Sequence, residues 1–253
     1  MLAIDAGNTR VKWLFGRSAV PYGIVQAVEH RALDLRGLLR QAWAGQPRPL
    51  SVHVASVAGE TVDEAIRAAV QDCWPGVPLA FLVSRAECCG VRVAYARPER
   101  FGVDRLAALV AAHVGSEGNP VVVVDAGTAV TLDVIDAWGR HLGGLIMPGL
   151  RLLRECLQGK TAAVGAVPDS IPVVAADGVL QADTESCVLV GGHFMFIGGV
   201  LHAINAALGK AGAHAVLYLT GGDAPILAKA LGRGHVLRPD LVLEGVFLMA
   251  QAG

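Results

Sequence analysis

The sequence predicts an α/β protein made of two similar halves. Two observations carry this prediction: apolar strand patterns alternate with helical patterns, and the pattern that opens the chain recurs near its middle. The chain has 253 residues and is 53% hydrophobic, so it can bury a substantial core and is not expected to be disordered. One large domain or two of ordinary size are expected.

Each half opens with an apolar strand, a tight Asp-x-Gly turn and a second strand of alternating apolar residues, which is the pattern of a β-hairpin. Residues 1–4 lead into the turn at Asp5, and residues 121–124 lead into the turn at Asp125. Glycine, asparagine and proline cluster over residues 115–120 and break the helical pattern there. The predicted domains are therefore residues 1–115 and 120–253.

The remaining elements follow from the spacing of apolar residues and from glycine and proline breaks. Helices are predicted over residues 63–73, 106–114, 150–157, 181–208 and 224–231, and further strands over residues 51–56, 79–83 and 215–219.

The charge balance and the hydropathy of the chain argue against two kinds of partner, nucleic acids and membranes. With 21 Lys+Arg against 22 Asp+Glu, the chain has no basic surplus that would attract nucleic acid. No apolar stretch is expected to supply the roughly 20 uncharged residues of a membrane-spanning helix, because the run at residues 194–208 contains His202 and Asn205. The N-terminus lacks the basic and apolar segments of a signal peptide. We expect a cytoplasmic protein without a membrane or nucleic-acid partner.

The cysteines predict free thiols and no metal centre. There are five, an odd number, and none forms a Cys-x-x-Cys motif. The adjacent Cys88 and Cys89 are not expected to bridge or to chelate easily. The eight histidines form no His-Glu-x-x-His motif, so a zinc site is not expected.

The loop that begins at Asp5 has residues suited to phosphate. Its glycine lets the backbone approach a ligand closely, Asn8 and Thr9 add short donors, and Lys12 can reach a phosphate group. Asp5 would hold Mg²⁺ through water, since Mg²⁺ keeps several waters while one or two carboxylates anchor it. An ordinary hairpin turn favours the same residues for backbone reasons. Because the same pattern recurs at Asp125, we favour the interpretation that these turns bind a nucleotide.

A third glycine-rich turn, over residues 220–223, follows an apolar strand and precedes a helix, which suits contact with an adenosine or a phosphate. The chain has no Walker A loop and no Gly-x-Gly-x-x-Gly after a strand. The sequence therefore argues against a P-loop nucleotide-binding fold and against a Rossmann fold.

This combination resembles the actin-like ATPase superfamily, in which duplicated ribonuclease-H-like domains close on ATP in a cleft between them. An ordered set of motifs from residue 5 to about residue 223 resembles one branch more closely, the type III pantothenate kinases. The motifs are Asp5-Ala6-Gly7-Asn8-Thr9 with Lys12, Tyr95 ahead of Pro98, Phe101-Gly102-Val103-Asp104-Arg105, Asp125-Ala126-Gly127-Thr128, Gly143-Gly144-Leu145-Ile146-Met147-Pro148-Gly149, Thr184-Glu185 and Thr220-Gly221-Gly222.

The resemblance implies ATP-dependent phosphorylation of pantothenate to 4′-phosphopantothenate, the first step toward coenzyme A, by a homodimer that uses Mg²⁺. It implies that Asp104 accepts the proton of the substrate hydroxyl and that Asp125 holds a monovalent cation, K⁺ or NH₄⁺. The implied ATP contacts are Asp5, Ala6, Gly7, Asn8, Thr9, Arg10, Val11, Lys12 and Thr128. The implied pantothenate contacts are Tyr95, Gly102, Val103, Asp104, Arg105 and Thr184.

Structural roles are open for several of these residues. Asp104 and Thr184 can each be a helix N-cap, Arg105 a solvated charge at a helix start, and Tyr95 a partly buried anchor. Two other functions also remain open. One is a transcriptional accessory protein that keeps the kinase fold, and the other is a kinase acting on a different small hydroxy acid.

Overall fold

The computed structural model describes residues 1–17, 20–29, 34–158 and 179–252, which form two compact units. Unit 1 comprises Met1–Val121, Ile135–Gly143 and Asp240–Gly253. Unit 2 comprises Val122–Val134 and Gly144–Pro239. The end of the chain thus belongs to unit 1 rather than to the half that precedes it in sequence.

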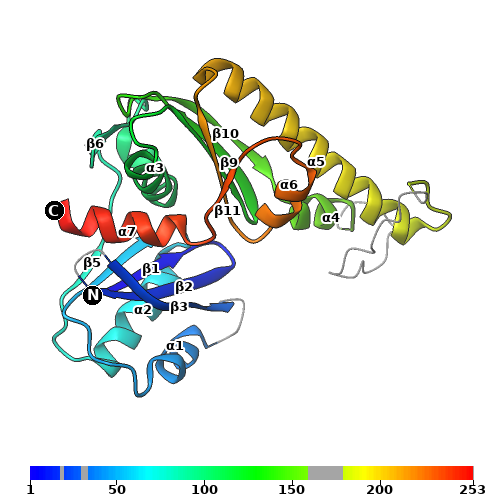
Figure 1. Cartoon of the computed structure of the whole chain (residues 1–253). Coiled ribbons are helices and arrows are strands. Elements are labelled where there is room, and N and C mark those ends of the chain that lie inside the picture. The colour runs from blue at the N-terminus through cyan, green and yellow to red at the C-terminus, as the bar shows by residue number, and fades with distance from the viewer. Residues whose placement is uncertain (18–19, 30–33, 159–178, 253) are drawn as a thin grey trace. The chain divides into compact units, whose positions relative to one another are not determined.

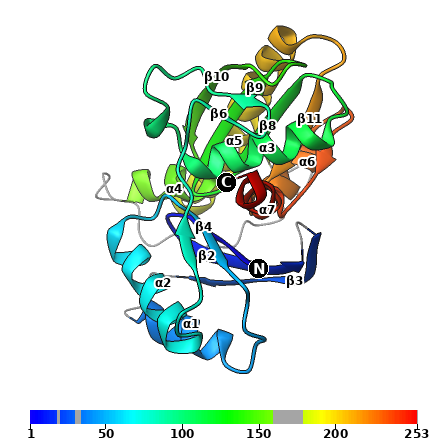
Figure 2. The ribbon, with the colours of Figure 1, turned by 90° about the vertical axis from the view of Figure 1, so that its left-hand side faces the viewer.

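Unit 1 is built on a five-stranded sheet of order β3-β2-β1-β4-β5 (Figures 1 and 2). Its strands are β1 (Leu2–Ala6), β2 (Arg10–Arg17), β3 (Val20–Glu29), β4 (Val52–Ser56) and β5 (Leu79–Phe81). Strand β1 pairs antiparallel with β2 and parallel with β4. Leu2, Ala3, Ile4 and Ala6 are fully buried in β1, as expected for the apolar run that opens the sequence.

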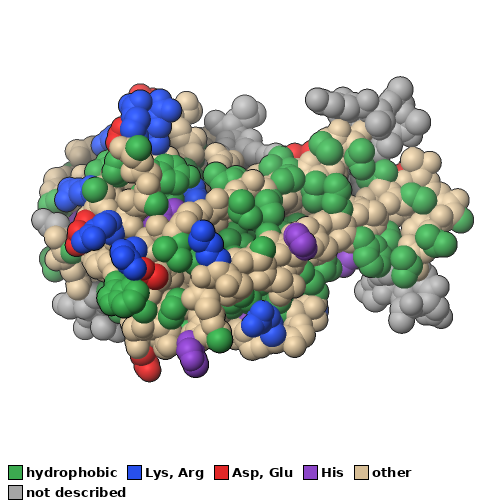
Figure 3. Space-filling view, turned by 90° about the horizontal axis from the view of Figure 1, so that it is seen from above, with side chains coloured by type: hydrophobic (Ala, Val, Ile, Leu, Met, Phe, Trp, Pro, Cys, Tyr) green, Lys and Arg blue, Asp and Glu red, His purple; other side chains and the backbone are tan. Residues whose placement is uncertain are grey.

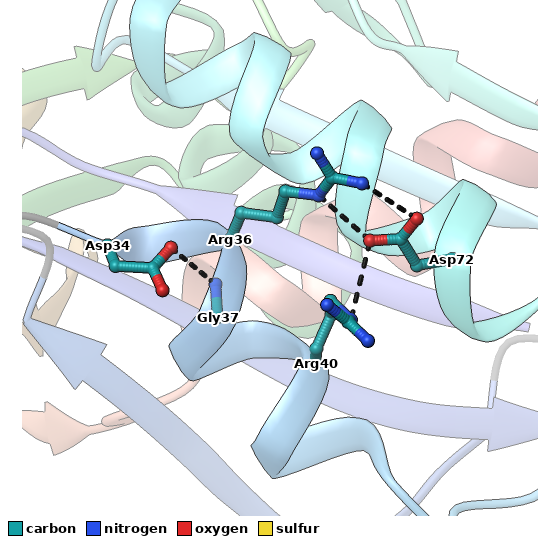
Figure 4. A network of polar contacts seen from close by, with 5 residues as sticks. All are labelled: Asp34, Arg36, Gly37, Arg40 and Asp72. Carbon is teal, nitrogen blue, oxygen red and sulfur yellow. Dashed lines mark hydrogen bonds and ion pairs between the residues drawn. The ribbon is translucent and has the colours of Figure 1, made fainter.

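Helices α1 (Leu35–Trp43) and α2 (Glu60–Cys73) contact each other in unit 1. Figure 4 shows the polar contacts between them: the guanidinium of Arg36 binds Asp72 through two hydrogen bonds of 2.8 Å, and Arg40 lies 3.4 Å from the same carboxylate. Asp34 caps α1 by accepting a hydrogen bond from Gly37 N at 2.8 Å. Helix α1 had no counterpart among the predicted elements.

Helix α3 (Val103–Gly115) packs against the C-terminal helix α7 (Leu241–Ala252), and the two lie side by side in Figures 1 and 2. The contact is close because a Cβ on Gly245 would collide with the carbonyl oxygen of Ala107. Seven residues of α7 are buried, including Val246 and Phe247. This burial explains why the last helix belongs to unit 1.

Gly245→Ala is expected to destabilise the fold. The added methyl group meets backbone rather than a flexible side chain, so the two helices must separate, at a cost of about 1–3 kcal/mol in the free energy of unfolding. Gly209→Ala, in a helical position with open space around it, is the matched control and is expected to stabilise by about 0.5–1 kcal/mol. Thermal unfolding of both variants measures the difference, and equal melting temperatures would contradict it.

Unit 2 repeats the strand order of unit 1. Its sheet runs β10-β9-β8-β11-β12, so in both sheets the first strand lies between the second and the fourth. The strands are β8 (Val121–Ala126), β9 (Ala129–Ile135), β10 (His141–Pro148), β11 (Val216–Thr220) and β12 (Val236–Leu237), and the helices are α4 (Leu150–Gln158), α5 (Thr184–Ala211) and α6 (Ala224–Ala230). The duplicated α/β plan predicted from the two Asp-x-Gly turns is confirmed.

Among the described residues, one helix, α5, is long and apolar enough to cross a membrane by length and composition, with a mean hydropathy of 1.8. The expectation that no segment meets this test was therefore wrong, because two uncharged polar residues do not prevent it. Phe196, Val200 and Ile204 lie in the buried core of unit 2, and the core helix of a globular protein passes the same test. In Figure 3 apolar side chains (green) are interspersed with polar ones on the surface shown.

Candidate active site

The predicted ATP loop connects β1 to β2. Asp5 and Lys12 lie directly opposite each other in the strand register, so both side chains project from the same face of the sheet. Gly7 N donates a hydrogen bond to Arg10 O at 3.0 Å and closes the turn, with Asn8 exposed at its tip. The hairpin predicted from the sequence is confirmed, and it exposes backbone and short polar side chains at one end of the sheet.

The other predicted ATP contacts of this loop are either buried side chains or part of an exposed ion pair. Ala6 and Val11 are fully buried, so only their backbone atoms could face a ligand. The guanidinium of Arg10 binds Glu29 Oε1 through Nε at 3.1 Å and Nη2 at 2.9 Å, with both side chains more than half exposed. An exposed pair of this kind contributes little to stability and can exchange for another anion.

Arg105 is a buried cation within unit 1. Its side chain is 7% exposed, and its Nη1 donates a hydrogen bond to the hydroxyl of Tyr95 at 3.1 Å. Its guanidinium also lies over the ring of Phe101, 4.4 Å from the centroid, which is a cation–π contact. The alternative interpretation of Arg105 as a solvated charge was therefore wrong, because the guanidinium is buried and held by Tyr95 and Phe101.

Asp104 lies in the first turn of α3, directly before Arg105. The N-cap of this helix is Gly102, so the interpretation of Asp104 as the cap was wrong. One carboxylate oxygen, Oδ1, accepts a hydrogen bond from Arg105 N at 2.7 Å. A Cβ on Gly102 would lie only 2.6 Å from the same oxygen, so glycine leaves the space that the carboxylate occupies. Asp104 is half-buried and fixed in orientation beside the buried cation.

His141 joins this cluster from a distant part of the sequence. Its ring lies 5.1 Å from that of Phe101 and 6.3 Å from that of Tyr95, centroid to centroid, and it is 5% exposed. The prediction missed His141, because it stands in a strand next to a glycine pair and no local pattern marks it. We call Tyr95, Phe101, Arg105 and His141 the aromatic–arginine cluster.

A hydrogen-bonded turn precedes His141. Asp136 accepts hydrogen bonds from Trp138 N at 3.0 Å and Arg140 N at 2.9 Å, and it binds Arg140 Nε at 2.6 Å. Burial raises the pKa of Asp136, but these hydrogen bonds outweigh burial and hold the pKa below its usual range. The carboxylate of Asp136 therefore keeps its negative charge, and the turn positions the start of β10.

In unit 2, backbone from three loops meets at the end of β8. A Cβ on Gly149 would collide with the carbonyl oxygen of Gly127, and a Cβ on Gly221, whose φ is +92°, would collide with Asp125 Oδ1. Gly149 N also donates to Thr128 O at 3.1 Å. Glycine is required at both positions, because a Cβ on Gly149 would collide with the backbone of Gly127 and Thr128, and a Cβ on Gly221 with Asp125 Oδ1 and the backbone of Ala126. We call Asp125, Gly127, Thr128, Gly149 and Gly221 the glycine cradle.

Thr184 lies elsewhere in unit 2. It is the first residue of α5 and is exposed, while the cap is Asp183, which accepts a hydrogen bond from Ser186 N at 2.8 Å. That hydrogen bond lowers the pKa of Asp183, and it shows that the interpretation of Thr184 as the cap was wrong. Thr184 lines a pocket of about 620 Å³ with residues of α4 and α5, including Cys156, Cys187 and Met195.

Asp5 and Asp125 are the two carboxylates predicted from the sequence to hold cations. The structure shows no group of three or more His, Cys, Asp or Glu side chains that could hold a metal ion among the residues that it describes. Asp5 supplies one half-buried carboxylate at a strand end, which suits Mg²⁺ held by water and phosphate. Asp125 Oδ1 and the carbonyl oxygen of Ala126 both lie next to the Cα of Gly221, and oxygen donors of this kind suit a hard cation.

Comparisons with known proteins identify the family. A model of the type III pantothenate kinases matches residues 1–206. The type III pantothenate kinase of Alkalilimnicola ehrlichii is 37% identical over 254 residues, covering 99% of this chain and 97% of the relative. That of Dichelobacter nodosus is 34% identical over 248 residues, covering 97% and 96%.

Solved structures show the same fold at low identity. A Campylobacter jejuni protein assigned to the Baf family of transcriptional activators is 19% identical and has a TM-score of 0.59, covering 99% of this chain and 98% of that one. The activator of 2-hydroxyisocaproyl-CoA dehydratase from Clostridium difficile, solved with bound ADPNP, is 12% identical and has a TM-score of 0.51, covering 100% and 93%. These similarities are evidence of the fold alone. By its sequence, this chain belongs to the type III pantothenate kinase family.

Proposed function

We propose that the aromatic–arginine cluster and Asp104 form the pantothenate site with which this kinase carries out ATP-dependent phosphorylation of pantothenate, a step of coenzyme A biosynthesis. The observation that carries the proposal is the buried guanidinium of Arg105, held by Tyr95 and Phe101. Pantothenate ends in a carboxylate, which a planar guanidinium binds through two parallel hydrogen bonds. Tyr95 is 37% exposed and accepts a hydrogen bond from Arg105, so it would also contact the substrate.

Asp104 accepts the proton of the substrate hydroxyl in this proposal. Its carboxylate follows Gly102 and Val103 in the chain and is fixed by the hydrogen bond from Arg105 N. Phosphoryl transfer passes through a loose transition state, so the carboxylate acts mainly by orienting the hydroxyl and by taking its proton late.

ATP binds to the β1–β2 loop and to Thr128 in this proposal. Asp5, Asn8 and Lys12 supply a carboxylate, an amide and an ammonium group at one strand end, and Thr128 supplies a hydroxyl beside the glycine cradle. Mg²⁺ at Asp5 and K⁺ or NH₄⁺ at Asp125 would offset phosphate charge when they are bound. Thr184 is proposed as a further pantothenate contact, and the protein is proposed to act as a cytoplasmic homodimer.

Asp125→Ala is expected to raise the K⁺ concentration for half-maximal activity roughly tenfold or more, because removing even an outer partner of a metal site weakens binding about 10–100-fold. Titration of KCl at saturating ATP measures this change. Glu64→Gln, an exposed carboxylate on α2, is the control and should leave the titration unaltered. An unaltered titration for Asp125→Ala would remove Asp125 from the cation site.

Phosphorus NMR tests the function directly. The purified protein is incubated with ATP, Mg²⁺, K⁺ and pantothenate, beside reactions that contain other small hydroxy acids or lack K⁺. We expect a phosphomonoester with pantothenate and a much slower reaction without K⁺. A product with another acid only would reassign the acceptor, and no product from a folded protein that binds ATP would contradict the proposed function.

A further inference from the structure

The turn between β6 (Glu87–Cys88) and β7 (Val91–Arg92) holds Cys88 and Cys89 in an unusual arrangement. This adjacent pair was not expected to bridge easily, and in extended backbone adjacent side chains do point to opposite faces. The structure differs, because Cys89 has a φ of +50°. This left-handed residue brings the two Sγ atoms within 3.7 Å of each other, with the Cys88 thiol donating to Cys89 Sγ.

The conformation of Cys89 is costly and is held by its neighbours. Among the described residues other than glycine, only Cys89 and Glu117 have positive φ values. The Cys89 thiol also lies 3.8 Å from the carbonyl oxygen of Leu248 in α7, and both cysteines are half-buried. Such strain persists only where the surroundings over-determine it, and it marks positions with a function.

We infer that Cys88 and Cys89 form a vicinal dithiol that a small-molecule disulfide oxidises reversibly to a disulfide within the turn. One cysteine thiolate attacks the small disulfide, forms a mixed disulfide and releases one small thiolate. The second cysteine then attacks the protein sulfur of the mixed disulfide and releases the other. The two protein thiols lose two electrons and two protons, and the small disulfide is reduced to two thiols.

The surroundings of Cys88 and Cys89 determine which thiol attacks first and which redox form of the pair is favoured. The Cys88 thiol donates its hydrogen bond to Cys89 Sγ, which favours the thiolate on Cys89, so Cys89 is the first nucleophile and Cys88 the second. Burial, together with the neighbouring Cys89, raises the pKa of Cys88 to about 11. Neighbouring Cα atoms are about 3.8 Å apart, whereas ordinary disulfides span about 4.4–6.8 Å. The ring is therefore strained and easily reduced, which makes the dithiol the resting form.

The turn is connected to the aromatic–arginine cluster in two ways. The chain runs from the end of β7 through Val93 to Tyr95. A Cβ on Gly139 would collide with the carbonyl oxygen of Gly90, so the two backbones touch. Arg92 N donates to Gly139 O at 2.9 Å, two residues before His141. Closing the disulfide must shift the backbone at Cys89 and Gly90, and the shift reaches both segments. This second part of the inference rests on the proposed function.

The chemical test uses the whole chain equilibrated with mixtures of glutathione and glutathione disulfide. We expect the mass to fall by about 2 Da, with loss of the two thiols of one peptide that contains Cys88 and Cys89. Cys88→Ser should abolish the mass loss. Cys89→Gly should abolish it as well without harming the fold, since glycine favours a positive φ. Cys73→Ser, in α2, is the control and should still lose the same mass.

Two chemical outcomes would overturn the inference. One is a stable glutathione adduct on either cysteine, and the other is oxidation confined to a different pair of cysteines. Both are read by peptide mass mapping and need no kinase activity, so a failure of the proposed function would not be mistaken for a failure of the thiol chemistry.

The kinetic test compares reduced and oxidised protein. We expect oxidation to raise KM for pantothenate about threefold or more, to change kcat less, and to be reversed by a dithiol reductant. Cys89→Gly should show no dependence on the redox buffer. An oxidised protein with unchanged KM would overturn the link to the pantothenate site while the dithiol itself stood.

Discussion

Asp104→Asn is expected to lower kcat roughly thousandfold, within the range of about 10²–10⁴ that a general base contributes. The amide keeps an oxygen that can accept the hydrogen bond from Arg105 N at the start of α3, so the fold should persist. It cannot accept the proton of the substrate hydroxyl. Turnover is measured at saturating ATP and pantothenate, and ATP binding is measured separately.

The control for this prediction is Glu99→Gln. Glu99 lies in the short 3-10 helix η1 (Pro98–Arg100), is 60% exposed and pairs with Arg97, so its neutralisation should leave kcat unchanged. If Asp104→Asn retained full turnover, Asp104 would have no part in the chemical step and its role would be confined to the start of α3.

Arg105→Lys is expected to raise KM for pantothenate about 10- to 100-fold, equivalent to the roughly 1.5–3 kcal/mol of a hydrogen bond to a charged group. Lysine keeps the charge but loses the planar pair of donors that matches a carboxylate. It also loses the fixed contacts with Tyr95 and Phe101. Because the reacting hydroxyl lies at the other end of pantothenate, kcat should fall much less.

Steady-state kinetics with varied pantothenate separate the two constants for Arg105→Lys. Arg97→Lys is the matched control, since this side chain is 64% exposed and pairs with Glu99. A lower kcat with unchanged KM would show that Arg105 does not bind the carboxylate. Circular dichroism distinguishes either result from misfolding.

The order of strands and helices was largely predictable because the signals are local. The two Asp-x-Gly turns lie in β1–β2 and β8–β9 as predicted, since apolar alternation and turn residues act within a few positions. Helix α3 begins at Val103 rather than at residue 106, because its cap is a glycine whose preference is too weak to mark the start. Helix α1 was missed although its apolar residues recur at the spacing of one helix face, on which Leu35, Leu39 and Trp43 are buried.

The sequence predicted several residues of the candidate site but not how they are arranged in space. Asp104 and Arg105 stand next to each other in the chain, so the motif identified both. His141 lies 36 residues after Arg105 in the chain. Only tertiary packing brings its ring into contact with Phe101. The contact of Gly221 with Asp125 joins two loops of unit 2 in the same way.

The sequence by itself determined the duplicated α/β plan, the family and the chemical identity of the acidic and basic candidates. These depend on periodicity, turn chemistry and ordered motifs, which are properties of short segments. Only the tertiary structure decided that Arg105 is buried, that α7 belongs to unit 1 and that the thiols of Cys88 and Cys89 lie together. Burial and backbone conformation depend on contacts between segments that are distant in the chain, and no local pattern contains that information.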